Sequence, residues 1–254
     1  MRAVFTLAWK DLRNLITSPL FYVIAGLCSV VWSSYYMPSL IGFAEQSRVY
    51  MQPGIESGMN LQRSVFLKHI WVTNFLYIFV IPALTMRLLA EEKRLRTYDL
   101  LLTSPVSATQ IALGKFLGGM GAVSALTFIS FLYPLGTRLV GDFPFGPLLT
   151  AYLGVLLVAG AYVAVGLFAS SLTESVLLSV VLGLIFNLLF WFIGQGGEDG
   201  ASTLAKVLEY MSIGQHYVSF ILGSIKINAL VFLLSVIGIF VFLTQRVVES
   251  SRWR

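Results

Sequence analysis

The chain has 254 residues, of which 57% are hydrophobic and only 11% charged, whereas about 25% of an ordinary soluble domain is charged. Its mean hydropathy of +0.83 excludes a water-soluble globular protein, and it also excludes a disordered chain, which needs low hydrophobicity and high net charge. The chain is therefore built for a bilayer. Anionic lipids of the inner leaflet attract basic residues, so the formal charge of +5 is not evidence for nucleic-acid binding.

The first 18 residues are amphipathic rather than continuously apolar. The apolar side chains that recur at helical spacing are Phe5, Ala8, Trp9, Leu12, Leu15 and Ile16. They predict a helix over residues 1–18 that lies on the inner leaflet through Trp9, with Lys10 and Arg13 at the headgroups. The alternative is a solvated leader that merely precedes the first span. Pro19 permits a sharp turn into that span, because proline breaks helical bonding across it.

Stretches without Asp, Glu, Lys or Arg locate the membrane spans, since an unpaired charge at mid-bilayer costs about 3 kcal/mol or more. A span needs about 20 apolar residues. Six charge-free windows can each hold one, the second running on to residue 90, and they cover residues 14–44, 70–86, 116–137, 143–173, 175–197 and 227–245. We therefore expect an all-α membrane protein with six transmembrane helices.

The basic residues predict the orientation of these spans, because cytoplasmic flanks collect Lys and Arg. With the N-terminus inside, the inner segments hold eleven of the 17 basic residues and the outer segments hold six. Both termini are therefore expected in the cytoplasm.

The segment between the second and third spans combines charges with a compact apolar patch. Its charged residues include Glu91, Glu92, Lys93, Arg94 and Arg96, and its patch is Leu100, Leu101 and Leu102. We expect a helix over residues 91–102, which Pro105 ends. Such a helix can rest on lipid or dock in a groove of a partner protein, and composition leaves both interpretations open.

A second helix start follows this proline. Ser107, with Gln110 three residues later, has the spacing of a capping box. The new helix should climb through Lys115 into the third span, where the long side chain of Lys115 can reach the headgroups. Gly114 and Gly118 form a small-xxx-small pair on the same helix, which favours close helix packing.

Residues 194–224 are expected to form a short re-entrant segment on the outer side. Gly196, Gly197 and Gly200 make a flexible entrance, and residues 210–225 are apolar but too short to cross. His216 and Tyr217 lie in this segment. No carboxylate accompanies His216 or the other histidine, His69, at metal-ligand spacing, so we expect interfacial or hydrogen-bonded imidazoles.

Catalytic motifs are missing from the sequence. Gly114 and Lys115 resemble the end of a P-loop, but Thr109 replaces its first glycine and Phe116 its Mg²⁺-binding hydroxyl. The single cysteine and two histidines also make a protein-only zinc site improbable. We expect no enzyme activity and no cofactor in this chain.

Several of these segments occur together in one known family. The loop between the second and third spans resembles the first cytoplasmic loop of ABC-2 type transporter membrane subunits. The resemblance lies in the acidic pair, the basic residues after it, Thr97, Asp99, the leucines, residues 104–107 and Gly114-Lys115. Residues 9–12 fit the same pattern more loosely. Residues 212–217 and 249–254 resemble the subgroup of the gliding-motility ABC transporter membrane subunit, although Lys226-Ile227-Asn228 departs from the basic-acidic pair expected there.

The resemblance implies one ABC-2 transmembrane domain over residues 1–254, with a connecting helix over residues 1–18, a coupling loop over residues 91–107 and an outer loop over residues 194–224. The residues implied to contact a nucleotide-binding ATPase subunit are Glu91, Glu92, Arg94, Arg96, Leu100, Leu101 and Leu102. ATP and Mg²⁺ would then be bound by that partner only.

The resemblance further implies a second permease subunit, identical or related, in a bacterial inner membrane. A membrane protein with a large external domain is an additional partner expected for the gliding-motility subgroup. The function implied is that of an ATP-driven exporter subunit.

Three other functions compete with this one. A stand-alone secondary transporter or channel is the main alternative, but no Asp or Glu occupies the middle of a span for a proton relay. An enzyme acting on lipids would need clustered acids, histidines or a metal motif. A passive anchor would not explain the capped cytoplasmic loop.

Overall fold

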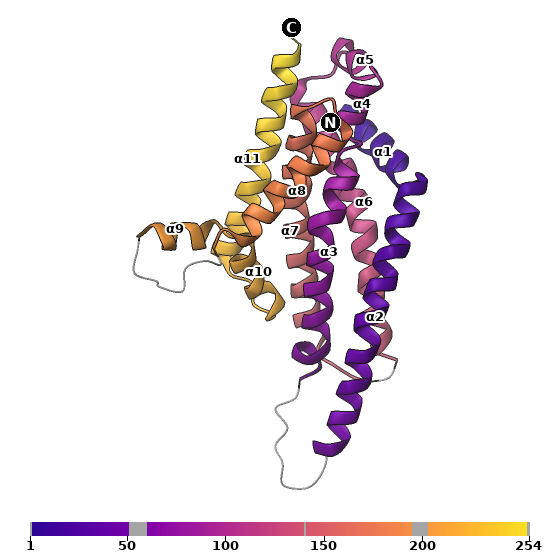
Figure 1. The fold of residues 1–254 in the computed structure, drawn as a ribbon, viewed down its shortest axis with the longest axis vertical. Helices are drawn as coiled ribbons and strands as arrows, with labels where there is room; N and C mark the ends of the chain where they lie inside the picture. The colour runs from indigo at the N-terminus through magenta and orange to yellow at the C-terminus, as the bar shows by residue number, and fades with distance from the viewer. Residues whose placement is uncertain (1, 51–59, 140, 195–202, 253–254) are drawn as a thin grey trace.

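The computed structural model describes residues 2–50, 60–139, 141–194 and 203–252, and all regular secondary structure within them is helical (Figure 1). In chain order the elements are α1 (Arg2–Ile16), α2 (Pro19–Tyr50), the π-helix η1 (Gln62–Phe66), α3 (Leu67–Thr85), α4 (Ala90–Arg94), α5 (Tyr98–Thr103), α6 (Ala108–Thr137), α7 (Phe145–Leu172), α8 (Val176–Phe192), α9 (Thr203–Met211), α10 (Ile213–Ile221) and α11 (Ile227–Ser251).

Helix α7 forms the centre of the bundle. It packs against α3, α6, α8, α10 and α11, and 72% of its most apolar window is buried within the protein. A helix that is apolar on all sides is stable only where it is surrounded. Its abundance of Ala, Gly and Val lets the neighbouring helices approach closely.

Among the described residues, five helical segments are long and apolar enough to cross a membrane, and they cover residues 19–47, 62–94, 108–137, 145–172 and 227–251. Helix α8 is equally apolar but has only 17 residues. At 1.5 Å per residue it is about 25 Å long, less than the hydrocarbon thickness of about 30 Å. The all-helical membrane fold is thus confirmed, whereas the fifth of the six expected spans is shorter than expected.

Helix α1 packs along the start of α6 through the predicted small-residue face. A Cβ atom at Gly114 would lie 2.8 Å from the Leu7 Cβ, and one at Gly118 would lie 2.8 Å from the Asp11 Cβ. Only glycine permits this approach. The amphipathic N-terminal helix is therefore fastened to the bundle on one side as well as exposed on the other.

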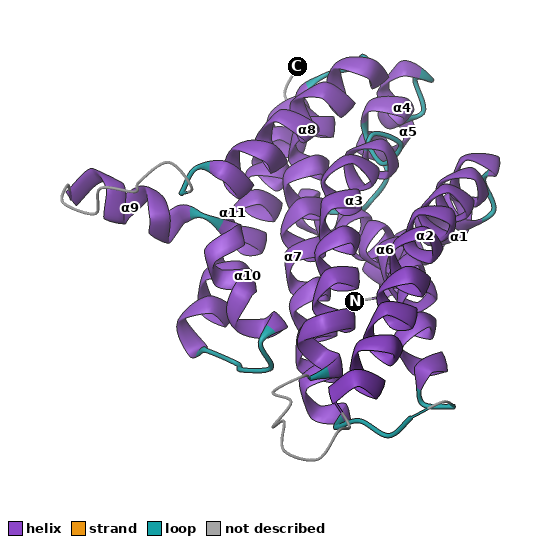
Figure 2. Ribbon diagram, turned by 60° about the horizontal axis from the view of Figure 1, so that its bottom comes forward, coloured by secondary structure: helices purple, strands orange, loops and turns teal. Residues whose placement is uncertain are grey.

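The segment after α8 is divided into two short helices (Figures 1 and 2). Helix α9 projects sideways from the bundle in both views, and α10 returns to pack on α7. The Tyr217 hydroxyl of α10 donates to the Ile70 carbonyl at 3.3 Å, so α10 lies beside the end of α3 that is remote from α4. The glycines expected at the entrance of this segment, at positions 196, 197 and 200, lie outside the described residues.

Replacing Gly118 with alanine tests the fastening of α1. We expect Gly118→Ala to lower the unfolding temperature in detergent and to expose α1 to protease, because the Cβ would meet the Asp11 Cβ and the Ala8 carbonyl oxygen, 3.1 Å away. The matched control is Gly136→Ala on the same helix, where nothing lies within 4 Å. The control should gain stability, up to about 1 kcal/mol from helix propensity; equal behaviour of both variants would contradict this packing.

Candidate functional site at the charged end of the bundle

Charged residues from distant parts of the chain meet at one end of the bundle. Figure 1 shows α4, α5 and the end of α11 at this end, with α1 beside them. The capping box that starts α6 is present, because the Ser107 hydroxyl accepts from the Gln110 amide and the Gln110 side chain accepts from the Ser107 amide. This part of the local prediction is confirmed.

The helix expected over residues 91–102 is wrong in one respect, because the structure breaks it into α4 and α5. Arg96 lies at the break with a φ of 57°, a left-handed conformation that costs a non-glycine residue roughly 1–2 kcal/mol. The amide groups of Arg96 and Thr97 donate to the Lys93 and Glu92 carbonyls, respectively. These bonds close the end of α4 and let α5 start in a new direction.

The three leucines of the predicted patch all lie on α5 but differ in exposure. Leu100 is 73% exposed, and Leu95, which precedes the break, is 59% exposed. Leu101 and Leu102 are half-buried and pack toward a small core that includes Ile111 of α6 and Val248 of α11. Within this loop, Leu95 and Leu100 are therefore the leucines most free to meet another molecule.

A buried ionic cluster joins α1, α4 and α6. The Lys115 side chain of α6 is 0% exposed, and its Nζ lies 2.8 Å from Glu92 Oε2 and 3.3 Å from Asp11 Oδ2. Its contact with Glu92 is an ion pair outside hydrogen-bond alignment, whereas that with Asp11 is also a hydrogen bond. Lys10 Nζ lies 3.3 Å from the other Glu92 oxygen.

This cluster corrects the expectation that Lys115 reaches the headgroups. Burial raises the pKa of Asp11, and the neighbouring Lys115 ammonium opposes that shift. The buried Asp11 carboxylate and the partly buried Glu92 carboxylate thus share one buried cation, so removal of the lysine would leave Asp11 buried without its counter-charge. The cluster links the N-terminal helix to the loop through α6.

Other contacts hold the loop against α7 and α11. The Ser170 hydroxyl accepts from the amides of Leu89, at 3.3 Å, and Ala90, at 2.8 Å. Lys93 Nζ donates to the Ser171 carbonyl at 2.5 Å. The Arg252 guanidinium donates to the Val106 carbonyl, which ties the end of α11 to the loop.

The remaining predicted charges lie nearer the surface. Glu91 pairs with Arg87 at 2.8 Å and with Arg94 at 3.8 Å. Arg94 and Arg96 are both exposed. The structure therefore separates the two acidic residues: Glu92 belongs to the buried cluster, whereas Glu91 forms pairs near the surface.

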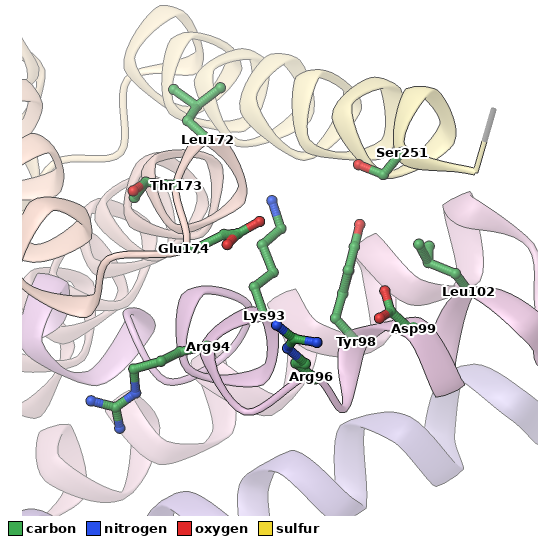
Figure 3. Close-up of a pocket in the computed structure, with 10 residues that line it drawn as sticks. All are labelled: Lys93, Arg94, Arg96, Tyr98, Asp99, Leu102, Leu172, Thr173, Glu174 and Ser251. Atoms are coloured by element: carbon green, nitrogen blue, oxygen red, sulfur yellow. The ribbon is translucent and has the colours of Figure 1, made fainter. Parts of the chain in front are cut away.

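An open cleft of about 670 Å³ lies between this loop, the α7–α8 turn and the end of α11. Figure 3 shows Lys93 pointing into the cleft between Tyr98 and Glu174, whereas Arg94 points away. Asp99 and Arg96 lie at its rim. The cleft is lined by both cations and anions, which suits contact with a charged protein segment.

The predicted inner-leaflet residues lie on the outer face of α1. Trp9 is 68% exposed, and so is Phe5 one turn earlier. Arg13 is exposed, whereas Lys10 is half-covered by its pair with Glu92. The apolar surface free for lipid is therefore that of Phe5 and Trp9, because the opposite face packs on α6.

The histidines are both hydrogen-bonded. The His216 Nε2 lies 2.9 Å from the Tyr210 carbonyl, and its ring stacks on Phe232 with centroids 4.1 Å apart. The His69 Nε2 lies 2.9 Å from the Ser130 hydroxyl. Among the residues that the structure describes, no group of three His, Cys, Asp or Glu side chains could hold a metal ion.

The ionic cluster is the feature that the sequence analysis missed. One signal was available, because Asp11 interrupts the apolar face of α1 between Ala8 and Leu15. A carboxylate on an apolar helix face usually has a cation opposite it. Nothing in the sequence identified Lys115 as that cation, since 104 positions separate the two residues.

One known protein family matches the part of the chain that contains the α4–α5 loop. Residues 60–213 match the family of ABC-2 family transporter proteins. This stretch exceeds half of the chain and contains α4, α5 and the buried lysine, so the chain belongs to that family. It is an integral membrane protein and a permease subunit of an ABC transporter, a class that works with an ATPase partner. No match was found among curated proteins.

The buried lysine gives a direct test of the cluster. We expect Lys115→Met to destabilise the protein by about 3–5 kcal/mol, because the buried Asp11 then loses its cation and the partly buried Glu92 keeps only the exposed Lys10. The double variant Lys115→Met with Glu92→Gln removes one of the two charges and should recover part of the loss. Thermal unfolding in detergent measures both. A double variant less stable than the single one would show that the charges do not interact in this way.

Proposed function

We propose that this chain couples ATP hydrolysis by a separate nucleotide-binding subunit to export across the bacterial inner membrane, and that the α4–α5 loop is its docking surface. The observation that carries the proposal is the combination of exposed Leu95 and Leu100 with a loop base that is tied to the bundle. Exposed apolar side chains ringed by charges favour a protein partner. ATP and Mg²⁺ would be bound by the partner.

The fastening of the loop suggests how force is transmitted. Glu92 connects the loop to α1 and α6, Ser170 connects it to α7, and Arg252 connects it to α11. A push on α4 would therefore move several membrane helices together rather than bend the loop alone. Because packed cores and interfaces switch between discrete arrangements, such a link can transmit a small displacement.

The same proposal includes six crossings with both ends of the chain in the cytoplasm. The start of α2 lies near α4, since Ser18, Pro19 and Glu91 line one cleft, and the end of α11 contacts Val106. Two chain ends at one end of the bundle require an even number of crossings. Helix α8 would then be the short crossing among the five longer ones.

Further partners remain part of this proposal. A second permease subunit, identical or related, would complete the membrane unit. The gliding-motility resemblance of residues 212–217 and 249–254 favours an additional membrane protein with a large external domain. In that case the complex would transmit force to this partner rather than move a small molecule.

Alkaline phosphatase fusions test the crossings, because the enzyme is active only outside the cytoplasm. We expect active fusions after Gly141 and after Met211, and inactive fusions after Arg96 and at the C-terminus. The fusion after Met211 is decisive for α8, since it is inactive if α8 does not cross. An active C-terminal fusion would contradict the orientation.

Truncation of the exposed leucine tests docking. We expect Leu100→Ala to weaken recovery of the ATPase subunit by about tenfold, because an interface leucine commonly contributes about 1–2 kcal/mol, while thermal stability stays unchanged. Leu101→Ala should instead lower stability, since Leu101 packs inside the protein. Co-purification and stimulated ATPase activity measure the first effect.

Two controls complete this experiment. Leu139→Ala is the same truncation at an exposed site on the opposite end of the bundle, and it should leave recovery of the ATPase subunit unchanged. Arg94→Glu should mainly change the salt dependence of association. If all of these variants recover the partner normally and alter only lipid association, the loop is an interfacial anchor and the docking proposal fails.

A further inference from the structure

A separate cleft lies at the end of the bundle remote from the charged loop. It measures about 430 Å³ and is bounded by α9, α10 and the start of α11. Two lysines line it, Lys206 from α9 and Lys226 from the residue before α11, against one carboxylate, Glu209. The cleft is therefore a concave surface with an excess of positive charge.

The amphipathic sequence of α9 indicates that this cleft lies at the depth of the lipid headgroups. Its sequence is amphipathic, and Val207 and Met211 on its apolar face are exposed rather than packed against the bundle. An amphipathic helix that projects from a membrane protein with its apolar face uncovered lies in the interface. The polar residues Lys206 and Glu209 of the same helix line the cleft.

The walls of the cleft combine fixed polar groups with apolar surface. The His216 ring is held by the Tyr210 carbonyl and by stacking on Phe232, so its position does not depend on a ligand. Val218 and Leu222 are exposed apolar side chains on the cleft wall. Such a lining suits a molecule with a charged head and an apolar body.

We propose that this cleft binds the phosphate-bearing headgroup of an anionic phospholipid from the adjacent leaflet, with Lys206 and Lys226 paired to the phosphate. Lysine ammonium groups bind phosphate as point charges. One lysine lies on α9 and the other directly before α11, so the bound lipid would join α9 to the start of α11. This distinguishes the cleft from a single interfacial lysine that reaches any headgroup.

Lipid titration of the purified protein tests the proposal without the ATPase subunit, so its failure is separate from failure of the coupling function. The probes are dioctanoyl phosphatidylglycerol, dioctanoyl phosphatidylcholine and glycerol 1-phosphate, with native mass spectrometry and thermal unfolding as readouts. We expect saturable binding of one phosphatidylglycerol per chain and a higher unfolding temperature. Lys206→Gln and Lys226→Gln should each weaken this binding about tenfold, the loss of one charge-assisted contact.

The matched control is Lys68→Gln, which removes an exposed lysine of α3 at the same end of the bundle but outside the cleft. Unchanged affinity in this control supports a specific cleft, whereas an equal loss overturns it in favour of general surface charge. Equal binding of phosphatidylcholine overturns selectivity for an anionic headgroup. Equal occupancy by glycerol 1-phosphate overturns the lipid as the source and assigns the phosphate to a soluble ligand.

Discussion

The backbone polar groups that this chain carries into hydrocarbon must be satisfied within the protein, because no water is available there. The helices satisfy most of the backbone internally, and hydroxyl groups satisfy parts of the helix ends. Ser107 caps α6, Ser175 caps α8, and Ser170 of α7 accepts from the first amides of α4. The same constraint explains why Lys115, once buried, is surrounded by carboxylates from two other helices.

The ionic cluster and the glycine contacts reinforce each other. Gly114 and Gly118 bring α1 close enough to α6 for Asp11 to reach Lys115, and the charge pair then favours that close approach. Glu92 adds the loop to the same cluster. Helix α1 would otherwise lie only on lipid. The cluster joins it to the α4–α5 loop, which is proposed to dock an ATPase subunit, so that helix and loop can move as one unit.

A feature of this protein could be predicted from the sequence only where the residues that form it lie close together in the chain. The capping box of Ser107 and Gln110 was predictable because both partners lie within one turn. The break at Arg96 was not, because no glycine marks the left-handed position and the bonds that close α4 involve backbone alone. The shortness of α8 was also hidden, since residues 175–197 contain no charge although the helix ends at Phe192.

The sequence by itself determined that this protein belongs in a bilayer and is helical. It also determined that no P-loop motif is present and which segments resemble ABC-2 permeases, because composition, periodicity and short motifs are local properties. Only the tertiary structure decided which leucine of the loop is exposed and which acidic residue joins the ionic cluster. Leu100 and Leu101 are neighbours in sequence, but only Leu101 packs against α6 and α11. Glu91 and Glu92 are also neighbours, but only Glu92 pairs with α1 and α6. Such contacts join residues far apart in the chain, and a single sequence carries no record of which distant residues meet.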